Sequence, residues 1–217
     1  MKKAFIFDLD GVIVDTAKFH YLAWRNLAKE INFDFTEEQN EQFKGVSRVR
    51  SLEILLGMAN YEATREEKEH WLIKKNEEYL SYIQKMDESE ILPDVPRVLE
   101  YLISSQQGIA LGSASKNARP ILERVALLDK FEAIIDGNDV TAAKPDPEVF
   151  VKGANALGIA AKDCIVFEDS IAGIQAANIA GMTSIGIGDA EVLHEADHVF
   201  TDFTQLSNDF LDTLINK

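Results

Sequence analysis

Residues 4–11 have the sequence Ala4-Phe5-Ile6-Phe7-Asp8-Leu9-Asp10-Gly11, in which four apolar residues precede two aspartates and a glycine. A short apolar run that ends in a polar loop is typical of a buried strand in a parallel sheet. Similar apolar runs recur at residues 108–112, 133–135, 164–167 and 183–187, and helical patterns alternate with them at residues 95–104, 118–128, 147–157 and 171–180. This alternation predicts an α/β fold: a doubly wound, Rossmann-like parallel sheet with helices on both faces.

The stretch of residues 16–86 interrupts this alternation. It contains no convincing strand and is predicted to form several helices, two of which begin at capping boxes headed by Thr36 and Thr64. We therefore expect an α/β catalytic core of residues 1–15 plus 87–217, and a helical cap of residues 16–86. An insertion directly after the first strand should lie over the C-terminal end of that strand, where open α/β sheets bind their ligands.

The composition excludes several classes of protein. Of the 217 residues, 46% are apolar, so the chain can bury a substantial core and is not disordered. Because the net charge is -15, we expect no nucleic acid and no membrane as partner. We also expect a monomer. The single cysteine, Cys164, rules out a disulfide framework and is expected to be buried and inert. Asp8 interrupts the first apolar run too early for a signal peptide, and no run approaches the roughly 20 apolar residues of a membrane span, so we expect a cytoplasmic protein.

Four polar clusters stand at, or just beyond, the C-terminal ends of predicted strands. They are Asp8 with Asp10, residues 113–116, Lys144, and Glu168 with Asp169. Because parallel strands bring their C-terminal ends to the same edge of a sheet, these clusters should be neighbours in space. Asp8 and Asp169, supported by Glu168, would supply the hard oxygen ligands that Mg²⁺ prefers. Crowded carboxylates repel one another, so we expect a divalent cation as cofactor.

The same clusters suit phosphoryl transfer. Asp8 can act as the nucleophile and form an aspartyl phosphate, and Asp10, two residues on, can serve as general acid/base. Lys144 can neutralise carboxylate and phosphate charge as the transition state develops. The Ser113 hydroxyl and the backbone N–H groups after it can hold phosphate oxygens.

Each cluster by itself also has a purely structural explanation. Asp-x-Asp-Gly is common in turns, Glu-Asp after a strand is often a solvated loop, and Ser-Ala-Ser-Lys could begin a helix that Asn117 would cap equally well. The conjunction of all the clusters, each at a strand end, favours a functional site because independent levels of the sequence agree.

These residues also match the four motifs of the haloacid dehalogenase superfamily, which the chain resembles over nearly its whole length. Residues 7–12 resemble the first motif, Ser113 the second, Lys144 the third and residues 168–169 the fourth. The helical insertion resembles the small helical cap of that superfamily. The resemblance implies an aspartyl-phosphate mechanism with Asp8 as nucleophile and Asp10 as acid/base, and one Mg²⁺ held by Asp8, the main-chain carbonyl of Asp10, Glu168 and Asp169.

Further features resemble the β-phosphoglucomutase family within that superfamily. They are the Asp15-Thr16-Ala17 turn with His20 and Trp24, the segment 44–48, the pair Lys75-Asn76, and the segment 113–117. The resemblance implies a mutase that interconverts β-D-glucose 1-phosphate and glucose 6-phosphate through a glucose 1,6-bisphosphate intermediate, which also serves as activator. It also implies that substrate is bound by Thr16, His20, Trp24, Lys44, Gly45, Val46, Ser47, Arg48, Lys75, Ser113, Ala114, Ser115, Lys116, Asn117 and Lys144.

The spacing of Thr16, His20 and Trp24 supports part of this assignment, because residues four apart share one stripe of a helix. An aromatic ring and an imidazole suit a sugar, although such a pair is more often part of a packed interior. In the family, Arg48 and Lys75 correspond to the site of the phosphate that is not transferred. Lys74 could replace Lys75, and Arg48 could instead be a solvated residue in the first turn of a helix.

The sequence departs from the family pattern at two places, and two alternative functions remain. Val49-Arg50 stands where more acidic or polar residues are expected, and Gly112 stands where alanine is common.

A sugar-phosphate phosphatase of the same superfamily would share the chemistry, but water would hydrolyse the phosphate on Asp8. A phosphorylatable receiver domain also uses an aspartate, Mg²⁺ and a lysine, but it carries no helical insertion of about 70 residues after its first strand.

Overall fold

A computed structural model of the chain describes residues 2–216. Six strands form one sheet in the order β3-β2-β1-β4-β5-β6, and all neighbouring strands are parallel. The strands are β1 (Ala4–Phe7), β2 (Gly108–Gly112), β3 (Ala133–Ile135), β4 (Cys164–Glu168), β5 (Thr183–Ile187) and β6 (His198–Phe200). The reversal of strand order at β1 is the mark of a doubly wound sheet, so the predicted α/β fold is confirmed.

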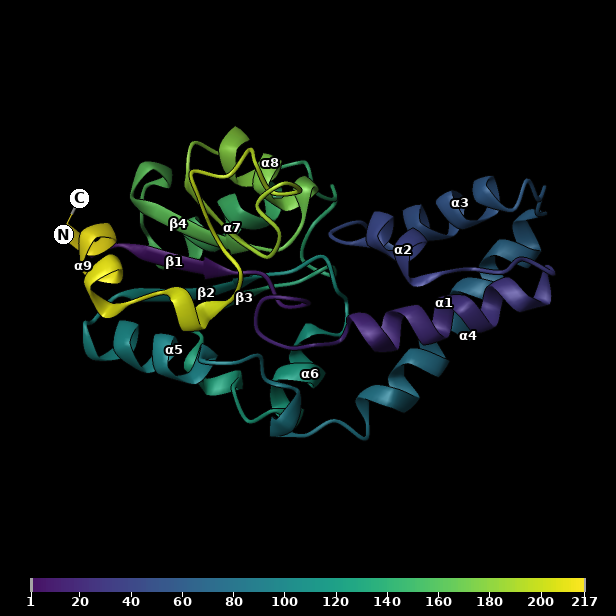
Figure 1. Cartoon of the computed structure of the whole chain (residues 1–217), viewed down its shortest axis with the longest axis horizontal. Coiled ribbons are helices and arrows are strands. Elements are labelled where there is room, and N and C mark those ends of the chain that lie inside the picture. The colour runs from purple at the N-terminus through teal and green to yellow at the C-terminus, as the bar shows by residue number, and fades with distance from the viewer. Residues whose placement is uncertain (1, 217) are drawn as a thin grey trace.

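Helices cover both faces of this sheet (Figure 1). They are α5 (Val95–Ser104), α6 (Ala118–Arg124), α7 (Glu148–Leu157), α8 (Ile171–Ile179) and α9 (Asn208–Asn216). Side chains on β1 alternate between the faces: Phe5 and Phe7 pack with α5, α6 and α9, whereas Ala4 and Ile6 pack with α7 and α8. Such a strand is buried on both sides, which is why its sequence is apolar throughout. We call the sheet and these five helices the α/β core.

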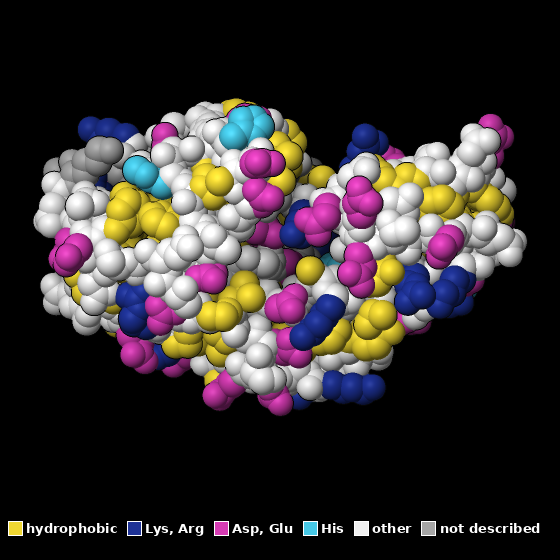
Figure 2. Space-filling model, in the orientation of Figure 1, with side chains coloured by type: hydrophobic (Ala, Val, Ile, Leu, Met, Phe, Trp, Pro, Cys, Tyr) yellow, Lys and Arg dark blue, Asp and Glu magenta, His cyan; other side chains and the backbone are white. Residues whose placement is uncertain are grey.

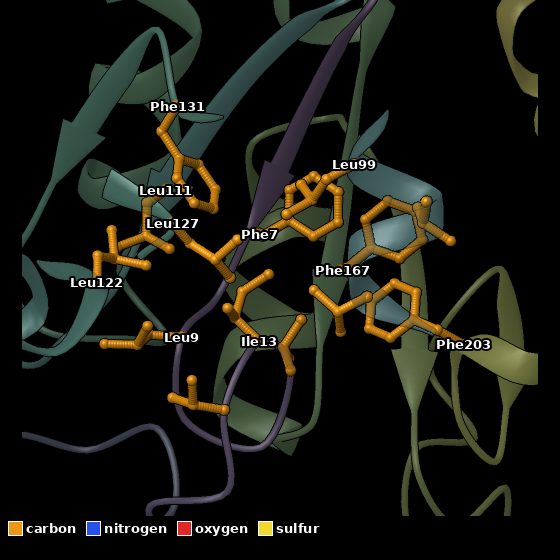
Figure 3. Close-up of a cluster of buried hydrophobic side chains, with 14 of the residues drawn as sticks. Phe7, Leu9, Ile13, Leu99, Leu111, Leu122, Leu127, Phe131, Phe167 and Phe203 are labelled. Atoms are coloured by element: carbon orange, nitrogen blue, oxygen red, sulfur yellow. The ribbon is translucent and has the colours of Figure 1, made fainter. Parts of the chain in front are cut away.

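Aliphatic and aromatic side chains together fill the first of these two layers (Figure 3). The rings of Phe7 on β1 and Phe167 on β4 stack with their centroids 4.7 Å apart, and the ring of Phe203 lies 5.4 Å from that of Phe167. All three side chains are at most 1% exposed. This packing fixes β1 against β4 and therefore sets the positions of the polar residues that follow both strands.

Residues 17–83 form four helices that extend away from the sheet, and we call them the helical block (Figure 1). They are α1 (Ala17–Glu30), α2 (Glu37–Asn40), α3 (Arg48–Met58) and α4 (Arg65–Ile83). The block has its own apolar cluster, centred on Trp24, Leu55 and Trp71. Both predicted capping boxes are present at the starts of α2 and α4.

The sequence missed some elements and misjudged one boundary. Helix α6 ends at Arg124 rather than near residue 128, because Ala126 takes a positive φ of 53° that ends the helix. Strand β6 has only three residues at the edge of the sheet, too few for a clear alternation. Short 3₁₀ turns lie between these helices and strands: η1 (Glu41–Phe43), η2 (Glu88–Glu90), η3 (Leu128–Lys130), η4 (Ala161–Asp163) and η5 (Phe203–Gln205). None of the helices in residues 2–216 combines the length and the apolar character that crossing a membrane requires.

The aromatic layer generates a first prediction. Phe167→Ala should lower the free energy of unfolding by about 3–5 kcal/mol, because a buried ring is lost and a cavity remains. Urea unfolding followed by circular dichroism measures this change. The matched control is Ile179→Ala, whose side chain is 64% exposed and whose removal should change stability by no more than about 0.5 kcal/mol. Equal effects at the two positions would contradict this account of the core.

Candidate active site

The polar clusters meet at the C-terminal edge of the sheet. Phe7 pairs in register with Leu111 on β2 and with Phe167 on β4, so the residues after these three positions are brought together. A cavity of about 410 Å³ lies between this edge and the helical block. In the space-filling view the surface is hollowed between the two parts, and acidic and basic side chains lie side by side there (Figure 2).

Lys144 lies between two carboxylates at the floor of the cavity. Its Nζ donates to Asp8 Oδ1 at 2.5 Å and also to Glu168 Oε1, and all three side chains are at most 8% exposed. Burial alone would lower the pKa of Lys144, but the charges of Asp8 and Glu168 outweigh burial and hold that pKa above its ordinary value. Lys144 is therefore a permanent cation beside Asp8.

The negative charge of Asp8 is only partly balanced by this lysine. Burial raises the pKa of Asp8 to about 7, Lys144 opposes the shift, and the nearby charges of Glu168 and Asp10 add to it. Glu168 is fully buried, and its second oxygen accepts from the Ser170 backbone N–H at 2.9 Å and from the Ser170 hydroxyl at 2.8 Å. Both Glu168 oxygens are thus engaged, and this residue lies behind Lys144 rather than in the cavity wall.

The carboxylate of Asp169 completes the acidic cluster. It lies against Gly11, whose φ is +81°, and a Cβ at Gly11 would overlap the carboxylate. Burial and the charges of Glu168 and Asp8 raise the pKa of Asp169 well above its ordinary value, and Lys44 Nζ lies 3.7 Å from Asp169 Oδ2. The loop after β1 therefore needs a glycine at position 11 to admit this side chain.

The donor set fits magnesium, although the protein groups alone do not complete a site. Within residues 2–216, no three His, Cys, Asp or Glu side chains cluster tightly enough to hold a metal by themselves. Mg²⁺ commonly takes only one or two carboxylates together with water and substrate phosphate oxygens. Asp8 and Asp169 would supply these carboxylates, and a divalent cation would relieve the repulsion that raises both pKa values.

Asp10 is held by the first residue of the segment that leads into the helical block. The hydroxyl of Thr16, which is fully buried, donates to Asp10 Oδ1. Burial raises the pKa of Asp10, while Thr16 and Lys75 oppose the shift. His20 Nε2 lies 3.9 Å from the same Asp10 oxygen. A carboxyl group with a raised pKa at the cavity surface is suited to donating a proton.

A buried lysine and a histidine face this aspartate from the helical block. Lys75 Nζ lies 2.8 Å from His20 Nδ1, and it also lies 4.9 Å from the Trp24 ring centroid and 4.6 Å from that of Tyr79. Burial and Arg48 lower the pKa of Lys75 to about 7, and burial and Lys75 lower the pKa of His20 well below its ordinary value. The lowered pKa favours the neutral form of His20, whose Nδ1 can accept from the ammonium group of protonated Lys75.

The structure distinguishes the two adjacent lysines of α4. Lys75 is 2% exposed and lines the cavity. Lys74 points away and pairs with Glu30 at 2.6 Å. The alternative that Lys74 faces the site is therefore wrong.

The loop between η1 and α3 brings the helical block against the α/β core. Ser47 caps α3 by accepting from the Arg50 backbone N–H at 3.3 Å. Arg48 is half-buried, and its Nη1 donates to the Leu72 carbonyl at 3.4 Å. Gly45 has a φ of +72°, and a Cβ there would collide with the Ser170 hydroxyl of the core.

Residues 113–117 form a chain of hydrogen bonds along the opposite wall. The Ser115 backbone N–H donates to Ser113 Oγ at 3.1 Å, and the Asn117 backbone N–H donates to Ser115 Oγ at 3.2 Å. Asn117 precedes α6, but its side chain makes no capping hydrogen bond. The structural explanation of this segment as a helix cap is therefore wrong for Asn117.

Most of the residues named from the sequence line the cavity. Thr16 and Glu168 do not, because each lies behind the residue that it contacts, Asp10 and Lys144 respectively. The lining residues are Asp8, Asp10, His20, Trp24, Lys44, Gly45, Val46, Ser47, Arg48, Lys75, Ser113, Ala114, Ser115, Lys116, Asn117, Lys144 and Asp169.

Sequence reasoning missed other lining residues. Tyr79 belongs to the same wall as Lys75 and could have been found, because it stands four residues after Lys75 on one helix. Asn76, which the sequence already paired with Lys75, lines this wall as well. The segment 140–143 lines the cavity as well, but its sequence carries no chemical signal beyond its position before Lys144.

Comparison with known proteins agrees with this geometry. The sequence pattern described as haloacid dehalogenase-like hydrolase matches residues 2–181. A β-phosphoglucomutase of Bacillus subtilis (strain 168) is 40% identical over 211 residues, which cover 96% of this chain and 93% of that protein. The fructose-1-phosphate phosphatase YqaB of Escherichia coli (strain K12) is 30% identical over 184 residues, 84% of this chain and 94% of that protein.

A solved structure is also similar over the full length. The crystal structure of β-phosphoglucomutase from Clostridium difficile matches with a TM-score of 0.94 and 40% identity, covering 100% of this chain and 98% of that one. The family predicted from the sequence is thus confirmed. The chain belongs to the haloacid dehalogenase-like hydrolase family, in which it is similar to β-phosphoglucomutases.

Proposed function

We propose that the protein is a β-phosphoglucomutase that interconverts β-D-glucose 1-phosphate and glucose 6-phosphate through glucose 1,6-bisphosphate. The observation that carries the proposal is a cavity that receives positive charge from both parts of the molecule. From the α/β core, Lys144 contacts Asp8 at the sheet edge; from the helical block, Arg48 and Lys75 line the cavity. A mutase needs a site for each of two phosphates, since its bisphosphate intermediate must bind in two orientations. The 40% identity to two β-phosphoglucomutases supports this choice.

The chain's own residues provide the steps of the transfer. An oxygen of Asp8 attacks the phosphorus of the bisphosphate, the bond between phosphorus and the sugar oxygen breaks, and Asp10 gives its proton to that oxygen. In the reverse direction Asp10 takes the proton from a sugar hydroxyl, which then attacks the phosphoryl group on Asp8. Lys144 and the Ser113 segment hold the phosphoryl oxygens throughout. Thr16 orients Asp10 for both steps.

We propose that Mg²⁺ is the cofactor, held by Asp8, Asp169 and the main-chain carbonyl of Asp10. Glu168, which the sequence also assigned as a ligand, instead fixes Lys144 beside the metal in this proposal, because Lys144 and Ser170 engage both of its oxygens. When bound, the metal would offset the negative charge of the carboxylates and the phosphate.

We further propose that residues 16–86 act as a cap on the core formed by residues 1–15 plus 87–217. Closure of the cap would exclude water from the phosphorylated Asp8, so that a sugar hydroxyl receives the phosphoryl group instead. The cap has its own apolar cluster and can therefore move as a unit. We place the enzyme in the cytoplasm as a monomer that acts on small-molecule sugar phosphates.

The decisive experiment follows two products at once. The purified protein is incubated with Mg²⁺, β-glucose 1-phosphate and a trace of the 1,6-bisphosphate, while glucose 6-phosphate and free phosphate are both measured. We expect glucose 6-phosphate with little free phosphate, and we expect Asp8→Ala to abolish the reaction because the nucleophile is gone. Free phosphate as the main product would overturn the mutase in favour of a phosphatase, the activity named for the relative from Escherichia coli.

The acidic cluster predicts the thermal response to magnesium. Mg²⁺ should raise the Tm of the wild type, since a ligand of the native state present at 100 times its Kd adds about 2.7 kcal/mol of stability. Asp169→Asn should remove this response and should raise the Tm of the metal-free protein, because one of the mutually repelling buried carboxylates is gone. Asp129→Asn, at an exposed position far from the cluster in sequence, should respond like the wild type. A full magnesium response in Asp169→Asn would exclude Asp169 as a ligand.

The depressed pKa of Lys75 predicts how KM depends on pH. Lys75 attracts phosphate only when protonated, and its pKa is about 7, so the KM for sugar phosphate should rise as pH increases from 7 to 9, by up to about tenfold per pH unit. The phosphate itself is already a dianion in this range. Lys75→Met should have a high KM that no longer changes with pH in this way. Lys74→Met, the matched control, should keep the wild-type profile; the same flat profile in both variants would refute the assignment.

A further inference from the structure

Two asparagines meet across the wall of the cavity. Asn76 belongs to α4 of the helical block, and Asn117 belongs to the core loop before α6. Asn117 Nδ2 donates to Asn76 Oδ1 at 3.1 Å. Across residues 2–216, no other side chain of α4 forms a hydrogen bond with the α/β core. This contact therefore joins the helical block to the α/β core at the wall of the cavity.

The side chain of Asn117 is free for this contact. An asparagine before a helix ordinarily accepts a hydrogen bond from an N–H group in the first turn. Asn117 occupies that position before α6 but makes no such bond. Its amide instead extends toward the helical block, and both asparagines are half-buried and line the cavity.

The contact continues the chain of hydrogen bonds along residues 113–117, which we call the phosphate loop after its proposed role. That chain runs from Ser113 through Ser115 to the backbone of Asn117, so the core fixes the main chain of Asn117 and Asn76 fixes its amide. One hydrogen of Nδ2 is directed to Asn76, which leaves the other for a ligand oxygen in the cavity. On the block side, Asn76 directly follows Lys75, whose ammonium group contacts His20.

We propose that Asn76 is a positioning residue, which orients the Asn117 amide toward the sugar phosphate and couples closure of the helical block to occupation of the phosphate loop. Asn76 thereby helps to direct the phosphoryl group of Asp8 to the sugar rather than to water. Without Asn76 the Asn117 amide must be ordered when substrate binds, and the block loses one of its attachments to the core. The inference rests on the proposed mutase function.

A second contact between the helical block and the α/β core joins Lys44 Nζ to Asp169 Oδ2, which lie 3.7 Å apart. That contact joins two charged groups, one of which is a proposed magnesium ligand. The pair Asn76–Asn117 is uncharged, so the metal does not compete for these side chains when sugar phosphate binds. The two contacts therefore make separable contributions to closure.

The test compares Asn76→Ala with Asn117→Ala and the double variant. Asn76→Ala should raise the KM for sugar phosphate about two- to tenfold, the range expected for loss of one neutral hydrogen bond, and should increase the share of free phosphate among the products. Phosphorylation of Asp8 by a small acyl phosphate, which does not extend to Asn117, should proceed at the wild-type rate. Glu77→Ala, at the exposed neighbouring position on α4, should leave all three quantities unchanged.

The double variant distinguishes positioning from independent packing. If Asn76 acts through Asn117, the double variant will have the same KM and product ratio as Asn117→Ala alone. Multiplying effects would overturn the inference, and so would a wild-type KM and product ratio in Asn76→Ala. If the wild type forms no glucose 6-phosphate, the mutase proposal fails, and the same KM comparison on the sugar phosphate that it hydrolyses still decides the role of Asn76. Should Asn76→Ala fold poorly, Asn76→Leu provides the same test, because leucine keeps much of the side-chain volume but has no polar atom to accept the hydrogen bond.

Discussion

The ammonium group of Lys144 lies between the carboxylates of Asp8 and Glu168, and the arrangement of the site depends on this buried contact. Ions removed from water are costly unless every charge is paired and hydrogen-bonded. Here Glu168 is satisfied by Lys144 and Ser170, whereas Asp8 and Asp169 retain raised pKa values. The fold therefore leaves unbalanced negative charge at Asp8 and Asp169, where a divalent cation would bind. The cation would in turn attract the phosphoryl group that is transferred.

The sheet order makes this contact possible. Asp8 follows β1, which lies between β2 and β4, so the segments that begin at Ser113 and Glu168 flank it on both sides. The stacked rings of Phe7 and Phe167 lie one residue before Asp8 and Glu168. Hydrophobic packing below the site thus positions the charged groups above it, and a rigid scaffold of this kind is what phosphoryl transfer requires.

The helical block contributes a different electrostatic environment. In a chain with a net charge of -15, its Lys44, Arg48 and Lys75 gather at the cavity. The two segments that join the block to the core run side by side, since the Asp15 backbone N–H donates to the Glu90 carbonyl at 2.9 Å and Val14 pairs with Ile91. Adjacent connections of this kind suit a hinge, because a small change of backbone angle in both would swing the whole block.

The sequence by itself determined the local features: buried strands from apolar runs, helix starts from Thr36 and Thr64, and carboxylates at strand ends from Asp8 and Asp169. These follow from interactions between residues a few positions apart. Only the tertiary structure decided that Lys75 rather than Lys74 faces the cavity, that Glu168 lies behind Lys144, and that Asn76 meets Asn117. The rotation of α4 about its axis and the closeness of residues far apart in the chain are set by packing between elements, which no short stretch of sequence encodes.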